Sequence, residues 1–307
     1  MATRDRKNDR EPGSGDPYIE VRDLTMGWSD RVLQKEASFT VMRGTVFAIL
    51  GGSGCGKSTL MRYLVGLESP MSGDINYVGK GEPSLTVGRP PYGVMFQGGA
   101  LLGSMTIAEN VALPLVQWTD LPKPAIAAVV RSKLRLVQLE QASEKLPSEI
   151  SGGMKKRAAI ARAMALDPEL LFLDEPSAGL DPVSSAELDE LILTLKRTLG
   201  LTVVLVTHEL ESIYSIADEC IFLHKESATI LARGNPRQLR DEATDPRIVH
   251  FFHRQPRKEG GDEPEAVEPA ERRSDQAQYA PTVRRPLRGR LPSAASAQSA
   301  RPRTKNR

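Results

Sequence analysis

The chain has 307 residues, of which 40% are hydrophobic and 26% charged, so it has the composition of a globular protein able to bury a sizeable core. Its formal net charge of +2 is too small to indicate a nucleic-acid partner, and its two cysteines, Cys55 and Cys220, cannot form a disulfide framework, which favours the cytosol. No stretch approaches the roughly 20 apolar residues that span a bilayer, and residues 1–16 lack the apolar core of a signal sequence, so we expect membrane contact only through a partner.

The predicted elements begin after a charged N-terminal segment. Residues 1–16 carry glycine and proline and are expected to form a disordered arm. Apolar and polar residues then alternate over residues 18–24, which predicts a half-buried strand at the start of a folded domain. An apolar run over residues 45–50 suits a strand buried on both faces, and residues 58–67 follow it with helical spacing. Residues 92–96 predict a further strand.

A helical insert is expected over about residues 98–165, because helix-forming stretches such as 125–139 and 154–165 dominate this region. Strand and helix signals then alternate, as they do in a mostly parallel sheet that is covered by helices. The segments that alternate are residues 170–173, 184–199, 202–206, 209–217 and 219–223. This pattern predicts an α/β domain over residues 17–245.

The C-terminal part changes in composition. We expect residues 246–255 to form a short extension and residues 256–307 a disordered tail, acidic at first and basic at its end. Pro, Ala, Ser and Gln fill the gaps between the charges, so the tail cannot bury enough apolar surface to fold. Its basic end leaves two interpretations open: a solvated tail, or a contact with anionic lipid headgroups or nucleic acid.

A phosphate-binding loop is predicted where the chain matches G-x-x-x-x-G-K-[ST] between a strand and a helix. Glycines let backbone N–H groups approach phosphate oxygens, and the helix N-terminus adds a favourable dipole. Lys57 is expected to reach the β- and γ-phosphates of ATP, Ser58 to ligate Mg²⁺, and Cys55 to be a small packing residue. The predicted nucleotide-binding residues are Gly51, Gly52, Ser53, Gly54, Cys55, Gly56, Lys57, Ser58 and Thr59.

Two adjacent carboxylates, Asp174 and Glu175, end the apolar strand predicted over residues 170–173. Neighbouring positions point their side chains in different directions, which allows different roles. Asp174 suits the binding of Mg²⁺ through water, and Glu175 suits the orientation and deprotonation of the water that attacks the γ-phosphate. If the phosphate loop were absent, the simpler interpretation would be that the two carboxylates cap the following segment.

The segment Ile150 to Met154 lies upstream of these carboxylates, with Ser151 placed to cap a helix, and Gly152 and Gly153 leave N–H groups open to an anion. Together with the phosphate loop, it makes the chain resemble the nucleotide-binding subunits of ABC transporters. The resemblance implies a P-loop NTPase fold of the ABC type, with an antiparallel β subdomain and a helical insert, and ATP hydrolysis. It also implies a head-to-tail homodimer, in which Ser151, Gly152 and Gly153 contact ATP held by the other copy.

Gln97, which follows the strand predicted over residues 92–96, matches the family's Q-loop glutamine. The resemblance implies that Gln97 takes part in catalysis and joins Ser58 and Asp174 around Mg²⁺. We expect no other metal, since the remaining histidines lack further ligands at suitable spacing.

Three more residues match the family at single positions. Asp181 belongs to a segment similar to the D-loop, which crosses the dimer interface, and His208 matches the switch histidine that contacts the γ-phosphate. His208 also follows a predicted strand, at the edge where ligands of open α/β sheets collect. Trp28 lies where the family has an aromatic that stacks on adenine, although a tryptophan is also a common core residue.

Within the family, the chain resembles the subgroup that powers Mla-type and Mce-associated lipid transport in bacterial envelopes. Met154, where the commonest signature has Gln, carries this likeness together with residues 96–101, 110–114 and 245–248. It implies a cytoplasmic ATPase, peripheral at the inner face of the membrane, with transmembrane permease subunits and lipid-carrying envelope subunits as partners. In that subgroup the C-terminal extension packs on the neighbouring ATPase subunit.

Two other functions share these motifs. An importer ATPase for a small polar solute, such as an amino acid, would carry every catalytic residue. A soluble ABC ATPase that acts on nucleic acid or ribosomes gains slight support from the basic tail. The single phosphate loop and the lack of sustained heptads argue against it, and no nucleic-acid partner is expected.

Overall fold

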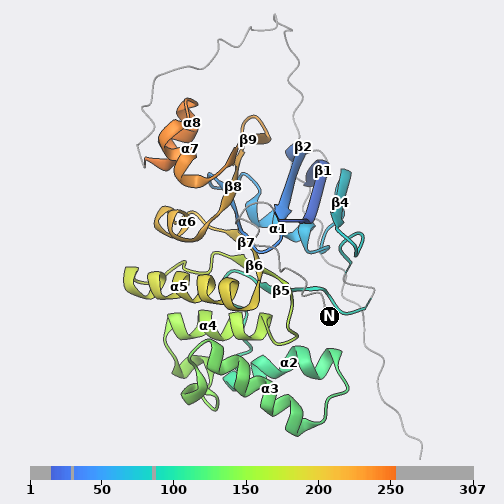
Figure 1. Ribbon diagram of the computed structural model, residues 1–307, viewed down its shortest axis with the longest axis vertical. Coiled ribbons are helices and arrows are strands. Elements are labelled where there is room, and N and C mark those ends of the chain that lie inside the picture. The colour runs from blue at the N-terminus through green and yellow to red at the C-terminus, as the bar shows by residue number, and fades with distance from the viewer. Residues whose placement is uncertain (1–14, 29–30, 85–87, 254–307) are drawn as a thin grey trace, which may run out of the picture. The chain divides into compact units, whose positions relative to one another are not determined.

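The computed structural model describes residues 15–28, 31–84 and 88–253 (Figure 1). Within them, a three-stranded and a six-stranded sheet share a hydrophobic core. Most of the predicted N-terminal arm and the whole tail over residues 256–307 lie outside the described residues, so their disorder stays a prediction.

The smaller sheet is antiparallel, with strand order β2-β1-β4. Its strands are β1 (Pro17–Trp28), β2 (Arg31–Met42) and β4 (Ser72–Tyr77). The alternation over residues 18–24 predicted only the start of β1, which extends to Trp28 and pairs along most of its length with β2. This sheet is the antiparallel β subdomain that the family resemblance implies.

The larger sheet has the order β5-β6-β7-β3-β8-β9, with every neighbouring pair parallel except β8 and β9. All residues of β3, β6 and β7 are buried, as expected for parallel strands covered on both faces. The strands are β3 (Val46–Gly51), β5 (Tyr92–Met95), β6 (Leu170–Asp174), β7 (Thr202–Val206), β8 (Glu219–His224) and β9 (Thr229–Gly234).

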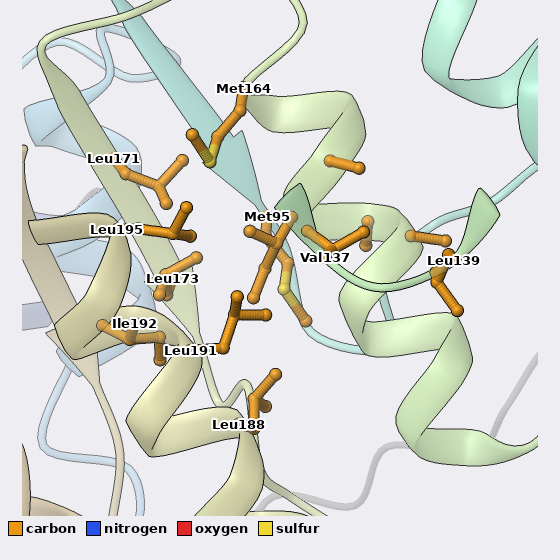
Figure 2. Close-up of a cluster of buried hydrophobic side chains, with 14 of the residues drawn as sticks. Met95, Val137, Leu139, Met164, Leu171, Leu173, Leu188, Leu191, Ile192 and Leu195 are labelled. Carbon is orange, nitrogen blue, oxygen red and sulfur yellow. The ribbon is translucent and has the colours of Figure 1, made fainter. Parts of the chain in front are cut away.

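Alternate residues of β6 face two different parts of the core. Leu171 and Leu173 pack against the helices of the insert and α5 (Pro182–Leu199), as Figure 2 shows. Leu170 and Phe172 pack toward the antiparallel sheet and α1 (Lys57–Leu64). The central strands therefore lie between two apolar layers, and successive side chains along a strand point alternately into one layer and the other.

The predicted helical insert contains α2 (Ile107–Trp118), α3 (Lys123–Leu136), two short 3₁₀ turns (Glu140–Ala142 and Pro147–Glu149) and α4 (Gly152–Ala163). Helix α3 ends three residues before the predicted boundary, and Gln138, just after it, has a left-handed φ of 59°. Helix α4 starts earlier than predicted because Ser151 caps it. Among the described residues, no helix has the length and apolar character that crossing a bilayer requires.

Helix α6 (Leu210–Ile216) precedes β8, and the chain continues past β9 with α7 (Pro236–Glu242) and α8 (Pro246–Phe252). Ile248 and Phe252 of α8 are buried beside Leu50 and Phe222 of the chain's own large sheet. The hydroxyl of Tyr214 on α6 also donates a hydrogen bond to the carbonyl of Phe252 at 3.0 Å. The extension thus begins as part of this chain's core, and its contact with a neighbouring subunit stays a prediction.

The substitution Phe252→Ala is expected to lower the free energy of unfolding by about 3 kcal/mol, because it removes a buried ring and leaves a cavity. Urea denaturation of the full-length chain, followed by circular dichroism, measures the change. Leu199→Ala, at an exposed position of α5, is the control and should change stability by less than about 0.5 kcal/mol. Equal stability of the two variants would contradict the packing of α8.

Candidate functional site

The carboxyl ends of the parallel strands carry the predicted site residues to one edge of the sheet. Val206, the last residue of β7, pairs with Ile49 of β3 on one side and with Asp174 of β6 on the other. The phosphate loop follows β3, and His208 follows β7 by two residues. The strand register therefore sets the phosphate loop, the carboxylates and the histidine beside one another.

Two glycines are required by the shape of the phosphate loop. Gly51 has a φ of 144°, and a Cβ there would lie 2.4 Å from the carbonyl oxygen of Leu223. Gly56 has a φ of 101° at the N-cap of α1, where a Cβ would lie 2.9 Å from the methyl group of Met26. The loop thus turns from strand into helix along a path that other residues would strain.

The loop is held by its own lysine and by a glutamine from β2. The Lys57 Nζ donates to the carbonyl oxygens of Gly51 at 2.9 Å and Gly52 at 3.1 Å. The buried Gln34 donates from Nε2 to the carbonyls of Cys55 and His224, each at 3.0 Å. Burial raises the pKa of the Cys55 thiol, against the charge of Lys57. Cys55 is therefore a neutral packing group, as the sequence predicted.

Ser58 and Asp174 place two oxygens side by side, as a cation site requires. The Ser58 hydroxyl donates to Asp174 Oδ1 at 3.2 Å, although the two residues are 116 positions apart in the sequence. Burial raises the pKa of the Asp174 carboxyl, while the Ser58 hydrogen bond opposes the shift. A partly desolvated carboxylate next to a hydroxyl fits Mg²⁺, which prefers oxygen ligands and retains several waters.

Glu175 contacts the histidine that follows β7. Its Oε1 lies 2.8 Å from Nδ1 of His208, and its backbone N–H donates to the carbonyl of Val206 at 2.8 Å. Glu175 has a left-handed φ of 50°, and its Oε2 is buried without a hydrogen-bond partner in the described part of the chain. A buried, unpartnered carboxylate oxygen at this edge is suited to accept a hydrogen bond from a water.

The segment at residues 151–153 forms the N-terminus of α4. Ser151 caps the helix by accepting a hydrogen bond from the Met154 N–H at 3.3 Å, and Ser151 and Gly152 are exposed. Figure 1 shows α4 among the helices of the insert and α1 beside the antiparallel sheet. In the described part of the chain, no hydrogen bond or ion pair joins residues 151–153 to residues 51–59 of the same chain.

The remaining predicted residues have different surroundings. Gln97 is exposed in the loop after β5. Asp181 is exposed and caps α5 through the N–H groups of Val183 and Ser184, so its carboxylate also has a structural role. Trp28 is 47% exposed, which excludes the alternative that it is a core residue. It follows Gly27, whose carbonyl accepts a hydrogen bond from a tyrosine of α1 at 3.0 Å.

Sequence analysis missed two residues that hold the site together. Gln34 fastens the phosphate loop, and Lys156 on α4 donates to the main-chain carbonyl of Glu175 at 2.9 Å. Both side chains are buried and contact backbone atoms that are distant in the sequence. Lys156 belongs to a run of basic residues, 155–157, next to the segment at residues 150–154, but neither that run nor a single glutamine in a strand indicates a contact with a distant backbone atom.

Comparisons with known proteins agree with the motifs. The family described as "ABC transporter" matches residues 34–178. The chain is 39% identical over 239 residues to the "Intermembrane phospholipid transport system ATP-binding protein MlaF" of Escherichia coli, covering 76% of this chain and 88% of that protein. It is 36% identical over 240 residues to the "Probable ribonucleotide transport ATP-binding protein mkl" of Mycobacterium tuberculosis, covering 76% of this chain and 66% of that protein.

A solved structure, a dimer of the ATP-binding cassette MJ0796 bound to ADP and phosphate, matches with a TM-score of 0.63 at 26% identity. The match covers 71% of this chain and 98% of that one. The predicted fold class is thereby confirmed. Fold, motifs and relatives agree that the chain belongs to the ABC transporter family, as one of its ATP-binding, ATP-hydrolysing subunits.

Proposed function

We propose that this chain powers a transporter of phospholipid or another lipid in a bacterial cell envelope. One observation supports the ATPase activity: the phosphate loop, Asp174, Glu175 and His208 lie at the same edge of the sheet. The similarity to MlaF, which is named as a phospholipid transport protein, supports the lipid substrate. The similarity to mkl supports ribonucleotide transport as the alternative.

Each residue of the site has its own role in ATP hydrolysis. The loop N–H groups and Lys57 bind the phosphates. Ser58, Asp174 and Gln97 would hold Mg²⁺, which would neutralise phosphate charge. Glu175 orients the attacking water and accepts its proton at a carboxylate oxygen.

His208 keeps the Glu175 carboxylate in place through the 2.8 Å contact and reaches toward the γ-phosphate. Trp28 stacks on adenine, a role that its exposed ring at the end of β1 permits.

The active form is a head-to-tail homodimer, in which each ATP lies between the phosphate loop of one copy and residues 151–153 of the other. The exposed N-terminus of α4 supports this arrangement, because backbone N–H groups at a helix N-terminus suit an anion. The dimeric state of the MJ0796 cassette supports it as well. Asp181 lies in the segment that crosses the interface.

The dimer docks at the inner face of the membrane under permease subunits, through the surface between Gln97 and the helical insert. Apolar side chains exposed on or next to this surface, Phe96, Leu102 and Trp118, support the location. ATP-dependent closure and opening of the dimer would move the permease between two states. Lipid-carrying envelope subunits would then determine which lipid is moved.

The variant Glu175→Gln should bind ATP as the wild type does and lose at least about 100-fold in turnover, because an amide cannot accept the proton of the attacking water. Steady-state hydrolysis and equilibrium binding of ATP to the full-length chain measure the two quantities. Glu190→Gln, on the exposed face of α5, is the matched control. Turnover that equals the control would remove Glu175 from the mechanism.

Mixed dimers test the head-to-tail arrangement. A Lys57→Ala chain paired with a Ser151→Ala chain has one site with both defects and one intact site, so hydrolysis should recover to roughly half of the wild-type rate. Each variant alone should be inactive. Two distinguishable tags isolate the mixed dimer before hydrolysis is measured. If verified mixed dimers show no more activity than either variant alone, the sites do not lie between the copies as proposed.

The transported substrate is tested by purifying the tagged full-length chain from membranes of its native host, in mild detergent. Mass spectrometry should then find permease subunits and bound phospholipid above the level of an untagged preparation. A bound amino acid or ribonucleotide instead would contradict the lipid proposal, and nucleic acid or ribosomes without membrane proteins would contradict transport.

A further inference from the structure

Helix α4 carries a buried lysine, Lys156, that contacts the turn containing Glu175. Lys156 is 8% exposed, and its Nζ donates a hydrogen bond to the main-chain carbonyl oxygen of Glu175 at 2.9 Å. The residues are 19 positions apart and belong to α4 and to the turn after β6. Lysine is rarely buried this deeply without a reason, because its ammonium group must lose water.

The carbonyl that Lys156 contacts belongs to a residue with an unusual backbone. Glu175 has a φ of 50°, a left-handed conformation that residues with a Cβ seldom adopt. Its backbone N–H donates to the carbonyl of Val206, and its C=O accepts from Lys156 at 2.9 Å and from the Ala178 N–H of the same turn at 3.3 Å, so both backbone polar groups have a partner outside the turn. The direction of the Glu175 side chain depends on this backbone, and so does its contact with His208.

The negative charges near Lys156 favour its ammonium group at this position. Burial lowers the pKa of the Lys156 ammonium, while the negative charges of Glu175 and Asp174 act in the opposite direction. The ammonium therefore lies close enough to both carboxylates to feel their charge. A neutral side chain of similar length would fill the same volume and lose this attraction.

We propose that Lys156 is a positioning residue for ATP hydrolysis, which holds the backbone of Glu175 so that its carboxylate faces His208 and the attacking water. Lys156 lies on the helix whose N-terminus, residues 151–153, is proposed to contact ATP bound by the partner. One helix thus joins the partner's nucleotide to this chain's own Glu175. This inference rests on the proposed function, in which Glu175 handles the water.

The variant Lys156→Met replaces the lysine with an unbranched apolar side chain one heavy atom shorter and removes the donor. Its kcat is expected to fall by about 10- to 100-fold, because a small displacement of a reacting group has an effect of this size. The KM for ATP should change by less than about threefold, since the phosphate loop is untouched. Lys156→Gln retains an N–H donor on a side chain shorter by one bond, and its kcat should lie between those of Lys156→Met and the wild type.

A second buried lysine provides the matched control. Lys133 on α3 is 5% exposed and pairs with Asp167, away from the carboxylates of the site. Lys133→Met removes the same group from a similar environment, so it should share the loss of stability in thermal melts and keep its kcat. Equal kcat values in Lys133→Met and Lys156→Met, both folded at the assay temperature, would overturn the proposal. Should Lys156→Met not fold, Lys156→Gln is compared with Lys133→Met by the same criterion.

A double variant separates this inference from the proposed function. If Lys156 acts through Glu175, then Lys156→Met should reduce single-turnover hydrolysis much less in the Glu175→Gln background than in the wild type. An equal reduction in both backgrounds would show that Lys156 acts elsewhere, with the role of Glu175 intact. Full activity of Glu175→Gln by itself would instead refute the proposed function on which the inference rests.

Discussion

The pairing of β7 with both β3 and β6 is the constraint on which the site depends. Val206 lies opposite Ile49 on one side and Asp174 on the other, so the phosphate loop and the carboxylates are aligned by backbone hydrogen bonds. A shift of one residue in either pairing would send alternate side chains to the opposite face of the sheet. The 3.2 Å contact between Ser58 and Asp174 spans the intervening strand and would be lost. Burial of all three strands on both faces makes such a shift costly.

Helix α4 is the second organising element, because it bonds to loops that come from two other parts of the chain. Ser151 caps its exposed N-terminus, and Lys156 holds the turn at Glu175. Near its end, the Arg162 guanidinium donates to the carbonyls of Gly99 and Ala100, each at 2.7 Å, in the loop that follows Gln97. A helix is stiff along its axis, so a displacement at one of these two contacts is transmitted to the other. The helical insert is therefore fastened to the sheet at the points where the chemistry is proposed.

The sequence predicted the parts of the fold that rest on local pattern. Continuous apolar runs revealed the buried parallel strands, and glycine and lysine spacing revealed the phosphate loop. The strands β2 and β4 were not predicted from local pattern, although residues 37–42 of β2 alternate between buried and less buried positions, and the resemblance alone implied their sheet. The roles of Gln34 and Lys156 depend on tertiary contacts across 21 and 19 residues, which no local pattern encodes. The left-handed backbone of Glu175 is likewise imposed by its surroundings, since its sequence would favour an ordinary strand end.

On the proposed function, the exposure of His208 explains why a single chain is an incomplete catalyst. The side chain of His208 is 63% exposed, whereas that of its partner Glu175 is only 11% exposed. A polar contact with one side in water is weakened by solvent, and it orients the carboxylate poorly. A second copy that brings residues 151–153 over the nucleotide would exclude water from this edge and strengthen the contact. Accurate placement of Glu175 would then follow dimer closure, so hydrolysis would occur after both copies have bound ATP rather than in a free subunit.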